Sequence, residues 1–141
     1  MKEAVTLGVV VVVRRGGRYL VIRRAPGVPV PGAWCFVGGA IEPGETQAEA
    51  VVREFREEVG ASVRPVERVW EYERPDGLLR LFWWRAELLN GDLRANPDEV
   101  AELRWCTHAE IRQLPHVLDS NLTFLEEVEA GRIRVAEEPK A

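Results

Sequence analysis

The hydrophobic positions of the chain indicate mostly strands. Runs rich in Val, Ile, Leu and aromatic residues predict strands at 5–13, 19–24, 34–39, 63–73, 78–88 and 102–106. Turn residues separate several of these runs, in RRGGR at 14–18, RPDG at 74–77 and NGD at 90–92. The segment 25–33 contains three prolines and two glycines and is therefore predicted to be a loop.

Three other segments have the spacing or the end signals of helices. Between 46 and 60 the apolar residues that recur at helical spacing are Ala48, Val51, Val52, Phe55 and Val59. Thr46 with Glu49 has the pattern of a capping box, and Gly60 is a typical C-terminal stop. Thr107 and Ser120 are expected to cap two shorter helices, the second of which runs to 129. This order of strands and helices predicts an α/β fold with helices packed on the faces of a mixed sheet.

Length and composition are those of one soluble domain. The chain has 141 residues, of which 46% are hydrophobic and 30% are charged. We expect the domain to span 1–135 and the polar segment 136–141 to be a frayed tail. The net charge of -4 argues against a protein that coats nucleic acid or binds an anionic membrane, so no stable nucleic-acid binding is expected.

Neither the first apolar run nor the cysteines indicate secretion. The run at 5–13 is too short to span a bilayer, and it lacks the basic start and the cleavage site of a signal peptide. Cys35 and Cys106 are a single, widely separated pair without C-x-x-C spacing. They predict two free thiols in a reducing compartment, and we expect a cytoplasmic protein.

The helix predicted at 46–60 carries an unusual group of glutamates. At 100° per residue, Glu54, Glu57 and Glu58 form one strip along the edge of the apolar stripe, with Arg53 beside Glu57 at i+4. Like charges at these spacings repel one another, and a solvated helix face usually intersperses them with cations. A hard divalent cation such as Mg²⁺ prefers clustered carboxylate oxygens and removes their repulsion. The strip therefore predicts a metal site.

The loop before this helix supports the same interpretation. It includes Gly38, Gly39 and Gly44, which allow the backbone to approach a ligand and to offer carbonyl oxygens to a metal. The N-terminus of the following helix favours anionic groups such as phosphates nearby. Together these features indicate a site where a metal and a phosphate compound meet.

The segment 39–61 resembles the Nudix box, whose pattern is G-x5-E-x7-R-E-U-x-E-E-x-G-U, where U is a bulky apolar residue. The fixed positions are all present, as Gly39, Glu45, Arg53, Glu54, Glu57, Glu58 and Gly60. Phe55 is aromatic where an aliphatic residue is usual, and Ala61 is small. The strand order and the segments PGAWCFVGG before the box and DEVAELRW after it also resemble Nudix hydrolases, and the compact length resembles MutT-like members.

The resemblance implies an α/β/α sandwich with a mixed central sheet and a loop-helix-loop metal site. It also implies hydrolysis of a pyrophosphate bond in a nucleoside diphosphate linked to another group, by attack of water on phosphorus. Glu54, Glu57 and Glu58, helped by the carbonyl of Gly38, would bind Mg²⁺, with Mn²⁺ as the alternative.

Three further residues complete the machinery that the resemblance implies. Glu45 and Arg53 would play supporting roles, Arg53 by orienting a glutamate. A downstream acidic residue often completes such a site in the family. Glu99 is the candidate for this role, and Asp98 and Glu102 are the alternatives.

The substrate is expected to be a nucleotide-type small molecule. Only one of Arg23 and Arg24 faces it, because successive side chains of a strand point to opposite sides. Gly39 lies in the loop that approaches a ligand. Asn121 lies where MutT-like members place a base-reading amide, although a position near a helix N-terminus explains an asparagine equally well. The aromatic residues that offer stacking surfaces are Trp34, Trp70, Tyr72, Trp83 and Trp84, of which most are expected in the core and Tyr72 is the candidate.

The sequence leaves the leaving group, the attacked phosphorus and the choice between monomer and homodimer open. The alternative function is a catalytically weak nucleotide-sensing or partner-binding module on the same fold. The box discriminates between the two, since binding-only relatives usually lose one or more of its glutamates. All of them are present here, which favours the enzyme.

Overall fold

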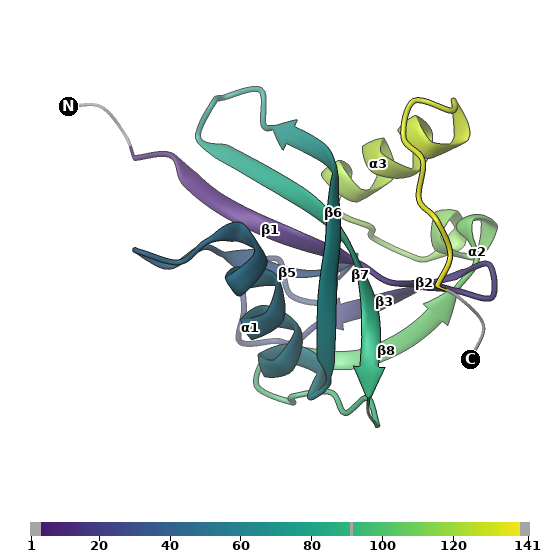
Figure 1. Ribbon diagram of the computed structural model, residues 1–141, viewed down its shortest axis with the longest axis horizontal. Helices are drawn as coiled ribbons and strands as arrows, with labels where there is room; N and C mark the ends of the chain where they lie inside the picture. The colour runs from purple at the N-terminus through teal and green to yellow at the C-terminus, as the bar shows by residue number, and fades with distance from the viewer. Residues whose placement is uncertain (1–3, 91, 139–141) are drawn as a thin grey trace.

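The computed structural model describes residues 4–90 and 92–138 (Figure 1). Its strands are β1 (Thr6–Val12), β2 (Arg14–Arg15), β3 (Arg18–Arg24), β4 (Trp34–Cys35), β5 (Val37–Ala40), β6 (Ser62–Glu73), β7 (Leu79–Asn90) and β8 (Val100–Cys106). Its helices are α1 (Gln47–Val59), α2 (His108–Gln113) and α3 (Asp119–Glu129). The turn predicted at 90–92 includes Gly91, which lies outside the described residues.

The strands form two sheets. β1 pairs antiparallel with β5 and parallel with β7, and β7 pairs antiparallel with β6, which gives a mixed sheet in the order β5-β1-β7-β6. In the second sheet, β3 pairs antiparallel with β2, β4 and β8. The predicted α/β fold with a mixed sheet is therefore confirmed.

From Gly8 to Val12, β1 is buried on both of its faces. Val9 belongs to an apolar cluster with Phe55 of α1, whereas the neighbouring Val10 belongs to a second cluster with Phe124 of α3. A strand covered on both faces needs apolar residues at successive positions, which explains the uninterrupted apolar run at the start of the chain. In Figure 1, α1 and α3 accordingly lie on opposite sides of β1.

The single strand predicted at 34–39 is in fact two strands in different sheets. β4 pairs with β3, and β5 pairs with β1. Phe36 lies between them, where the chain passes from one sheet to the other, and its N–H leaves the ladder. That N–H donates instead to the side-chain oxygen of Asn121 at 2.8 Å, so a buried amide of α3 stabilises the crossing.

The ends of α1 and α2 follow the predicted capping signals. Thr46 and Glu49 form a complete capping box, and Gly60 ends α1 in the left-handed conformation at φ 69°. Thr107 caps α2 in the same way. The predicted helix α3 is present and ends at Glu129 as expected, but its predicted cap is wrong. The helix begins at Asp119 after Leu118 without any side-chain cap, and Ser120 lies inside its first turn.

The segment after α3 lies against the β2 end of the molecule. Of the segment 136–141, only 136–138 is described. Within it, Glu138 accepts hydrogen bonds from Arg15 at 2.8 Å and from the backbone N–H of Leu88 at 2.5 Å. Cys35 and Cys106 are free thiols, as predicted, and both are buried rather than half-buried. Among residues 4–90 and 92–138, no helix combines the length and the apolar character needed to cross a membrane.

Candidate active site

The glycine-rich end of β5 lies directly against α1. A Cβ atom on Gly39 would collide with the carboxylate of Glu54, and one on Gly38 would collide with the backbone oxygen of Val9. Both positions therefore need glycine for steric reasons, at normal backbone angles. The consequence is a stretch of bare backbone, with accessible peptide groups, next to the first glutamate of the acidic strip.

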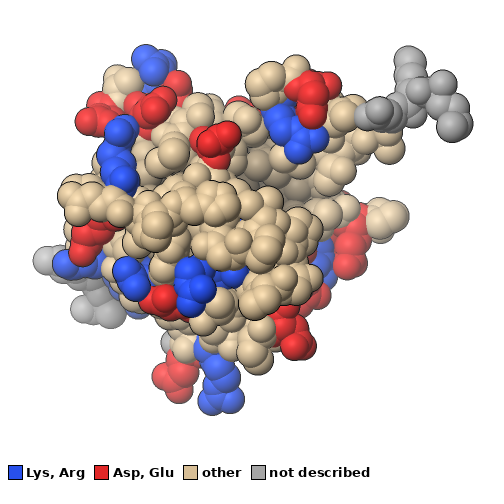
Figure 2. Space-filling view, turned by 180° about the vertical axis from the view of Figure 1, so that it is seen from behind, with Lys and Arg blue, Asp and Glu red and all other residues tan. Residues whose placement is uncertain are grey.

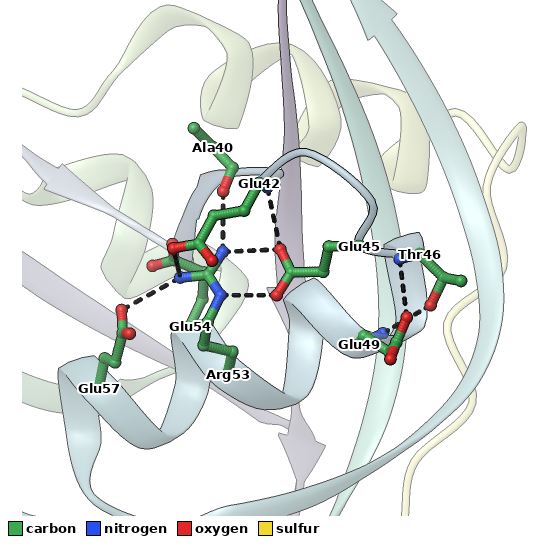
Figure 3. A network of polar contacts seen from close by, with 8 residues as sticks. All are labelled: Ala40, Glu42, Glu45, Thr46, Glu49, Arg53, Glu54 and Glu57. Atoms are coloured by element: carbon green, nitrogen blue, oxygen red, sulfur yellow. Dashed lines mark hydrogen bonds and ion pairs between the residues drawn. The ribbon is translucent and has the colours of Figure 1, made fainter.

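Arg53 is the centre of the polar network between the loop and α1 (Figure 3). Its Nε and Nη2 donate to the two carboxylate oxygens of Glu45 at 2.6 and 2.9 Å, and Nη2 also donates to the carbonyl of Ala40 at 2.9 Å. Its Nη1 donates to Glu54 at 2.8 Å and to Glu57 at 3.2 Å, which confirms the predicted i+4 pairing. One guanidinium thus fixes two glutamates of the strip and the loop before them.

Glu45 is the anchor of this network. Its Oε1 also accepts the backbone N–H of Glu42 at 3.0 Å. The hydrogen bonds from Arg53 and from this N–H lower the pKa of Glu45 from 4.5 to about 2. The hydrogen bonds to Glu45 in turn raise the pKa of Arg53, so the Arg53–Glu45 pair is fully ionised at neutral pH.

The buried face of α1 lies further toward the glutamates than the apolar spacing predicts. Ala48 and Val52 were expected in the core but are half-buried, whereas Ala50 is fully buried. Glu54 and Glu58 are only 8% and 6% exposed. The physical reason is the bare backbone of β5, which leaves room for carboxylates where side chains would otherwise stand.

Glu58 and Glu99 carry buried carboxylate oxygens without a partner. Oε2 of each has no hydrogen bond within the described part of the chain. Burial raises the pKa of Glu58 from 4.5 to about 10, with further contributions from Glu54 and Glu99. Burial, then Glu54 and Glu57, also raise the pKa of Glu99. The charges of Glu54 and Glu99 therefore act on Glu58, and those of Glu54 and Glu57 act on Glu99.

This set of oxygens fits a hard divalent cation. Carboxylates that are buried, unpaired and mutually repelling gain both a ligand and a neutralising charge when such a cation binds. Within residues 4–90 and 92–138, however, no three acidic, His or Cys side chains form a ready-made metal cluster. Glu57 instead points to Arg53, so it has to turn before it can join the other carboxylates.

The three downstream candidates lie in different places. Glu99 lies close enough to α1 for the charges of Glu54 and Glu57 to act on it. Glu102 binds Arg104 at 2.6 Å and Arg23 at 3.4 Å on β8 and β3. Asp98 is exposed. The structure thus brings Glu99 to the glutamates of α1 and pairs Glu102 with two arginines.

A cleft of about 520 Å³ adjoins the acidic groups. It is lined by Gly38 and Gly39 of β5, by Arg24 of β3 and by Asn121 of α3, together with residues of β1 and of the β6–β7 hairpin. Figure 2 shows the hollow between this hairpin and α3. Arg24 also lies close enough to Glu58 for its positive charge to oppose, in small part, the rise in the pKa of that carboxyl. Gly39 therefore borders both the cleft and Glu54, and Arg24 borders both the cleft and Glu58.

The structure separates the two candidate arginines. The Nε of Arg24 donates to the carbonyl of Pro29 at 2.5 Å, and its Nη1 lies 3.9 Å from the sulfur of Cys35 at the wall of the cleft. Arg23 is not among the lining residues and pairs with Glu102 instead. Alternation along β3 thus leaves Arg24 as the one that can reach a ligand.

The candidate aromatic residues do not line the cleft. Tyr72 packs on Trp70 with ring centroids 5.7 Å apart, and Trp83 stacks on Phe124 at 4.3 Å in the core. The aromatic residue that does line the cleft is Phe36. No pattern in the sequence predicts that Phe36 lines the cleft, because its position depends on the crossing of the chain between the two sheets.

Two polar residues of the cleft were also not predicted. Arg74 is part of the RPDG turn, and its Nε donates to both carboxylate oxygens of Asp76 at 2.9 Å at the outer end of the cleft. Ser120 accepts the side-chain NH₂ of Asn121 at 3.1 Å beside the cleft. The turn signal explains Arg74 locally, whereas Ser120 lies in the first turn of α3 and does not cap it. Only the tertiary fold shows that the two residues meet a common space.

Comparison with known proteins decides the family. The profile of the NUDIX domain matches residues 2–128 of the chain. The chain belongs to the NUDIX family. This confirms the predicted family and the predicted hydrolase class.

Two named relatives of the chain are a CTP pyrophosphohydrolase and an NAD-capped RNA hydrolase. The CTP pyrophosphohydrolase of Escherichia coli (strain K12) is 33% identical over 109 residues, which cover 76% of this chain and 79% of that protein. The NAD-capped RNA hydrolase NudC of Stutzerimonas stutzeri (strain A1501) is 31% identical over 106 residues, which cover 75% of this chain but 38% of that protein. The chain thus spans well under half of this second relative.

A solved NUDIX structure has the same fold. The crystal structure of a NUDIX hydrolase from Nitrosomonas europaea superposes with a TM-score of 0.79 at 23% identity, covering 98% of this chain and 78% of the other. At this identity the likeness concerns the fold alone. It agrees with the NUDIX α/β architecture predicted from the sequence.

Proposed function

We propose that this NUDIX protein hydrolyses a pyrophosphate bond in a nucleoside diphosphate linked to another group, by attack of water on phosphorus and with Mg²⁺ as cofactor. The observation that carries the proposal is the pair of buried, unpartnered oxygens of Glu58 and Glu99, which lie beside Glu54 next to the cleft. Such groups are costly to maintain unless a ligand satisfies them. The 33% identical CTP pyrophosphohydrolase supports a nucleotide as substrate.

The residues that would hold the cation are Glu54, Glu57, Glu58 and Glu99, with the carbonyl of Gly38. When bound, a divalent cation supplies Lewis-acid stabilisation of the phosphate oxygens and a water molecule of lowered pKa. Mn²⁺ has the same preference for oxygen ligands and is the alternative.

The remaining residues of the box orient these ligands. Arg53 holds Glu54 and Glu57 in place, and Glu45 holds Arg53 through two parallel hydrogen bonds. Because these partners are charged and the Arg53–Glu45 geometry is bidentate, Glu54 has a defined position before a substrate arrives, whereas Glu57 turns from Arg53 to the cation.

The cleft would hold the nucleotide part of the substrate. Arg24 can contact an anionic phosphate from the wall of the cleft, near Glu58. The side-chain NH₂ of Asn121 can donate to an acceptor on the base, because its carbonyl oxygen is already occupied by Phe36. Gly39 lines the same cleft as Arg24 and Asn121, and it offers its backbone to the substrate without a side chain in the way.

The test is turnover of a panel of nucleoside triphosphates, oxidised nucleotides, ADP-ribose and dinucleoside polyphosphates, with Mg²⁺, with Mn²⁺ and with a chelator. We expect metal-dependent release of phosphate, pyrophosphate or a mononucleotide from at least one compound. Glu57→Gln and Glu58→Gln should remove most of this turnover, whereas the matched variant Glu126→Gln, an exposed glutamate of α3, should not. Full activity of both box variants would contradict the metal site. Tight nucleotide binding without turnover would instead indicate a sensing module.

A further inference from the structure

The loop between β7 and β8 is hydrogen-bonded to the C-terminal end of α1. The N–H of Arg94 donates to the carbonyl of Val59 at 2.8 Å, and the N–H of Asn96 donates to the carbonyl of Glu58 at 2.9 Å. The side-chain Nδ2 of Asn96 donates to the carbonyl of Glu57 at 3.1 Å. The last carbonyls of a helix have no partners within the helix, so this loop satisfies three of them.

Asn96 is the residue where this contact meets the turn that carries Glu99, just before β8. Its carbonyl accepts the N–H of Glu99 at 3.0 Å and the N–H of Val100 at 2.7 Å. Its side-chain oxygen accepts the N–H of Asp98 at 3.1 Å. Every polar group of Asn96 is thus hydrogen-bonded, either to the two glutamate positions of α1 or to the backbone around Glu99.

The backbone of Glu99 has a second fixed point. Its carbonyl accepts the N–H of Ala25 at 3.0 Å, just after β3. The peptide groups on both sides of its Cα are therefore held, one by Asn96 and one by Ala25. Of these two contacts, only the one through Asn96 leads directly to Glu57 and Glu58.

We propose that Asn96 is a positioning residue that sets the distance between Glu99 and the glutamates of α1. The inference rests on the proposed function, because Glu99 matters only if it shares a site with Glu57 and Glu58. A helix end by itself needs no asparagine, since Gly60 and the N–H of Arg94 already cap α1. What the side chain of Asn96 adds is one amide that bridges the α1 backbone at Glu57 and the turn leading into Glu99. Loss of that bridge lets the two halves of the ligand set move apart.

The first experiment compares Asn96→Ala with wild type and with Thr107→Ala. The control removes the side-chain cap of α2, away from the site, and therefore matches the loss of local hydrogen bonds. Two quantities are measured: the dissociation constant for Mn²⁺ without nucleotide, by titration calorimetry, and kcat and KM separately. We expect Asn96→Ala to weaken Mn²⁺ binding or kcat by about 10- to 100-fold, the range found for residues that orient metal ligands. KM for the nucleotide should change little, because the cleft is untouched.

A second variant separates the two functions of the side chain. Asn96→Ser keeps an oxygen that can accept the N–H of Asp98 but is too short to reach the carbonyl of Glu57. We expect it to lose as much Mn²⁺ affinity as Asn96→Ala. Hydrogen exchange of the Glu99 and Val100 amides should be faster in both variants than in Thr107→Ala.

The outcomes distinguish the two proposals. If wild type is active and Asn96→Ala matches Thr107→Ala in Mn²⁺ affinity and kcat, the role of Asn96 is refuted and the proposed function stands. If Asn96→Ser behaves as wild type, the turn within the loop is sufficient and the bridge to α1 is refuted. If wild type itself neither binds Mn²⁺ nor cleaves any compound of the panel, the proposed function fails, and the role of Asn96 fails with it.

Discussion

Arg53 and Glu45 form a two-point ion pair, with Nε and Nη2 of the arginine at 2.6 and 2.9 Å from the two carboxylate oxygens. The pair joins the loop after β5 to α1, and it leaves Nη1 of Arg53 free to hold Glu54 and Glu57. A residue outside the acidic cluster therefore determines where two members of the cluster lie.

This geometry predicts that Arg53→Lys is not a conservative change. An ammonium group cannot make the parallel bonds to Glu45 while it also reaches Glu54 and Glu57. We expect kcat to fall about 10- to 100-fold, as for other residues that orient metal ligands. Steady-state kinetics on the best substrate of the panel measure the effect. Arg56→Lys is the matched control, since Arg56 lies on the same helix and its side chain, among residues 4–90 and 92–138, bonds only to Ser62. Equal losses in both variants would contradict the prediction.

The ionisation of Glu45 predicts how stability depends on acid. Its folded-state pKa is lowered from 4.5 to about 2, so its contribution is present above pH 4.5 and is lost as the pH falls from 4.5 toward 2. Glu45→Gln should therefore reduce the free energy of unfolding at pH 7. The difference from wild type should shrink as the pH is lowered through this window. Urea unfolding at pH 7, 4 and 3 measures it, and a difference that does not depend on pH would rule out this account.

Glu58 predicts the opposite trend in the metal-free protein. Its folded-state pKa is raised from 4.5 to about 10, so the folded state keeps a proton that the unfolded chain releases. Stability is then lost as the pH rises from 4.5 toward 10. In EDTA, Glu58→Gln should raise the melting temperature at pH 8 and change it little at pH 5.

Adding Mg²⁺ or Mn²⁺ tests whether a cation, rather than a proton, can stabilise the buried Glu58. A divalent cation favours the ionised carboxylate, so it should raise the melting temperature of wild type at pH 8 and have a smaller effect on Glu58→Gln. Glu126→Gln should behave as wild type in both series. A metal-free Glu58→Gln that melts below wild type at pH 8 would show that the carboxylate is stabilised by something other than a cation.

The part of the site that the sequence predicts is the part that one helix determines. The spacing of Glu54, Glu57 and Glu58 sets their relative directions, and Thr46 and Gly60 set the ends of α1, so local rules are sufficient. The apolar stripe was placed slightly wrongly. The depth at which α1 packs depends on the absence of side chains on β5, which helical spacing does not contain.

The cleft could not be predicted in this way. The contact of Asn121 with Phe36 spans 85 residues and depends on the chain changing sheets between β4 and β5. Arg74 reaches the cleft only because β7 pairs with β1. Such contacts follow from topology, so the substrate side was the weaker part of the sequence interpretation and the acidic side was the stronger.

The two glycines of β5 give a pair of contrasting predictions. Alanine at Gly39 meets only the end of the Glu54 side chain, which can move, so Gly39→Ala should fold but lose most of its activity. Alanine at Gly38 meets the backbone oxygen of Val9, which cannot move without disturbing the β1–β5 pairing. Gly38→Ala should therefore lower the melting temperature more than Gly39→Ala. Thermal denaturation and steady-state kinetics of both variants test this difference. Equal melting temperatures would contradict the prediction that Gly38 meets fixed backbone and Gly39 a movable side chain.

The neighbouring arginines of β3 test the position of the substrate. Arg24 lines the cleft, whereas Arg23 pairs with Glu102 outside it. A hydrogen bond to a charged group is worth about 1.5–3 kcal/mol, so Arg24→Ala should raise KM for the nucleotide by roughly 10- to 100-fold. Arg23→Ala breaks a partly exposed ion pair and should leave KM within about a factor of two. Since the two residues are adjacent on one strand, a larger effect of Arg24→Ala on KM would indicate that the nucleotide binds on the side that Arg24 faces. The reverse order would place the nucleotide on the side of Glu102.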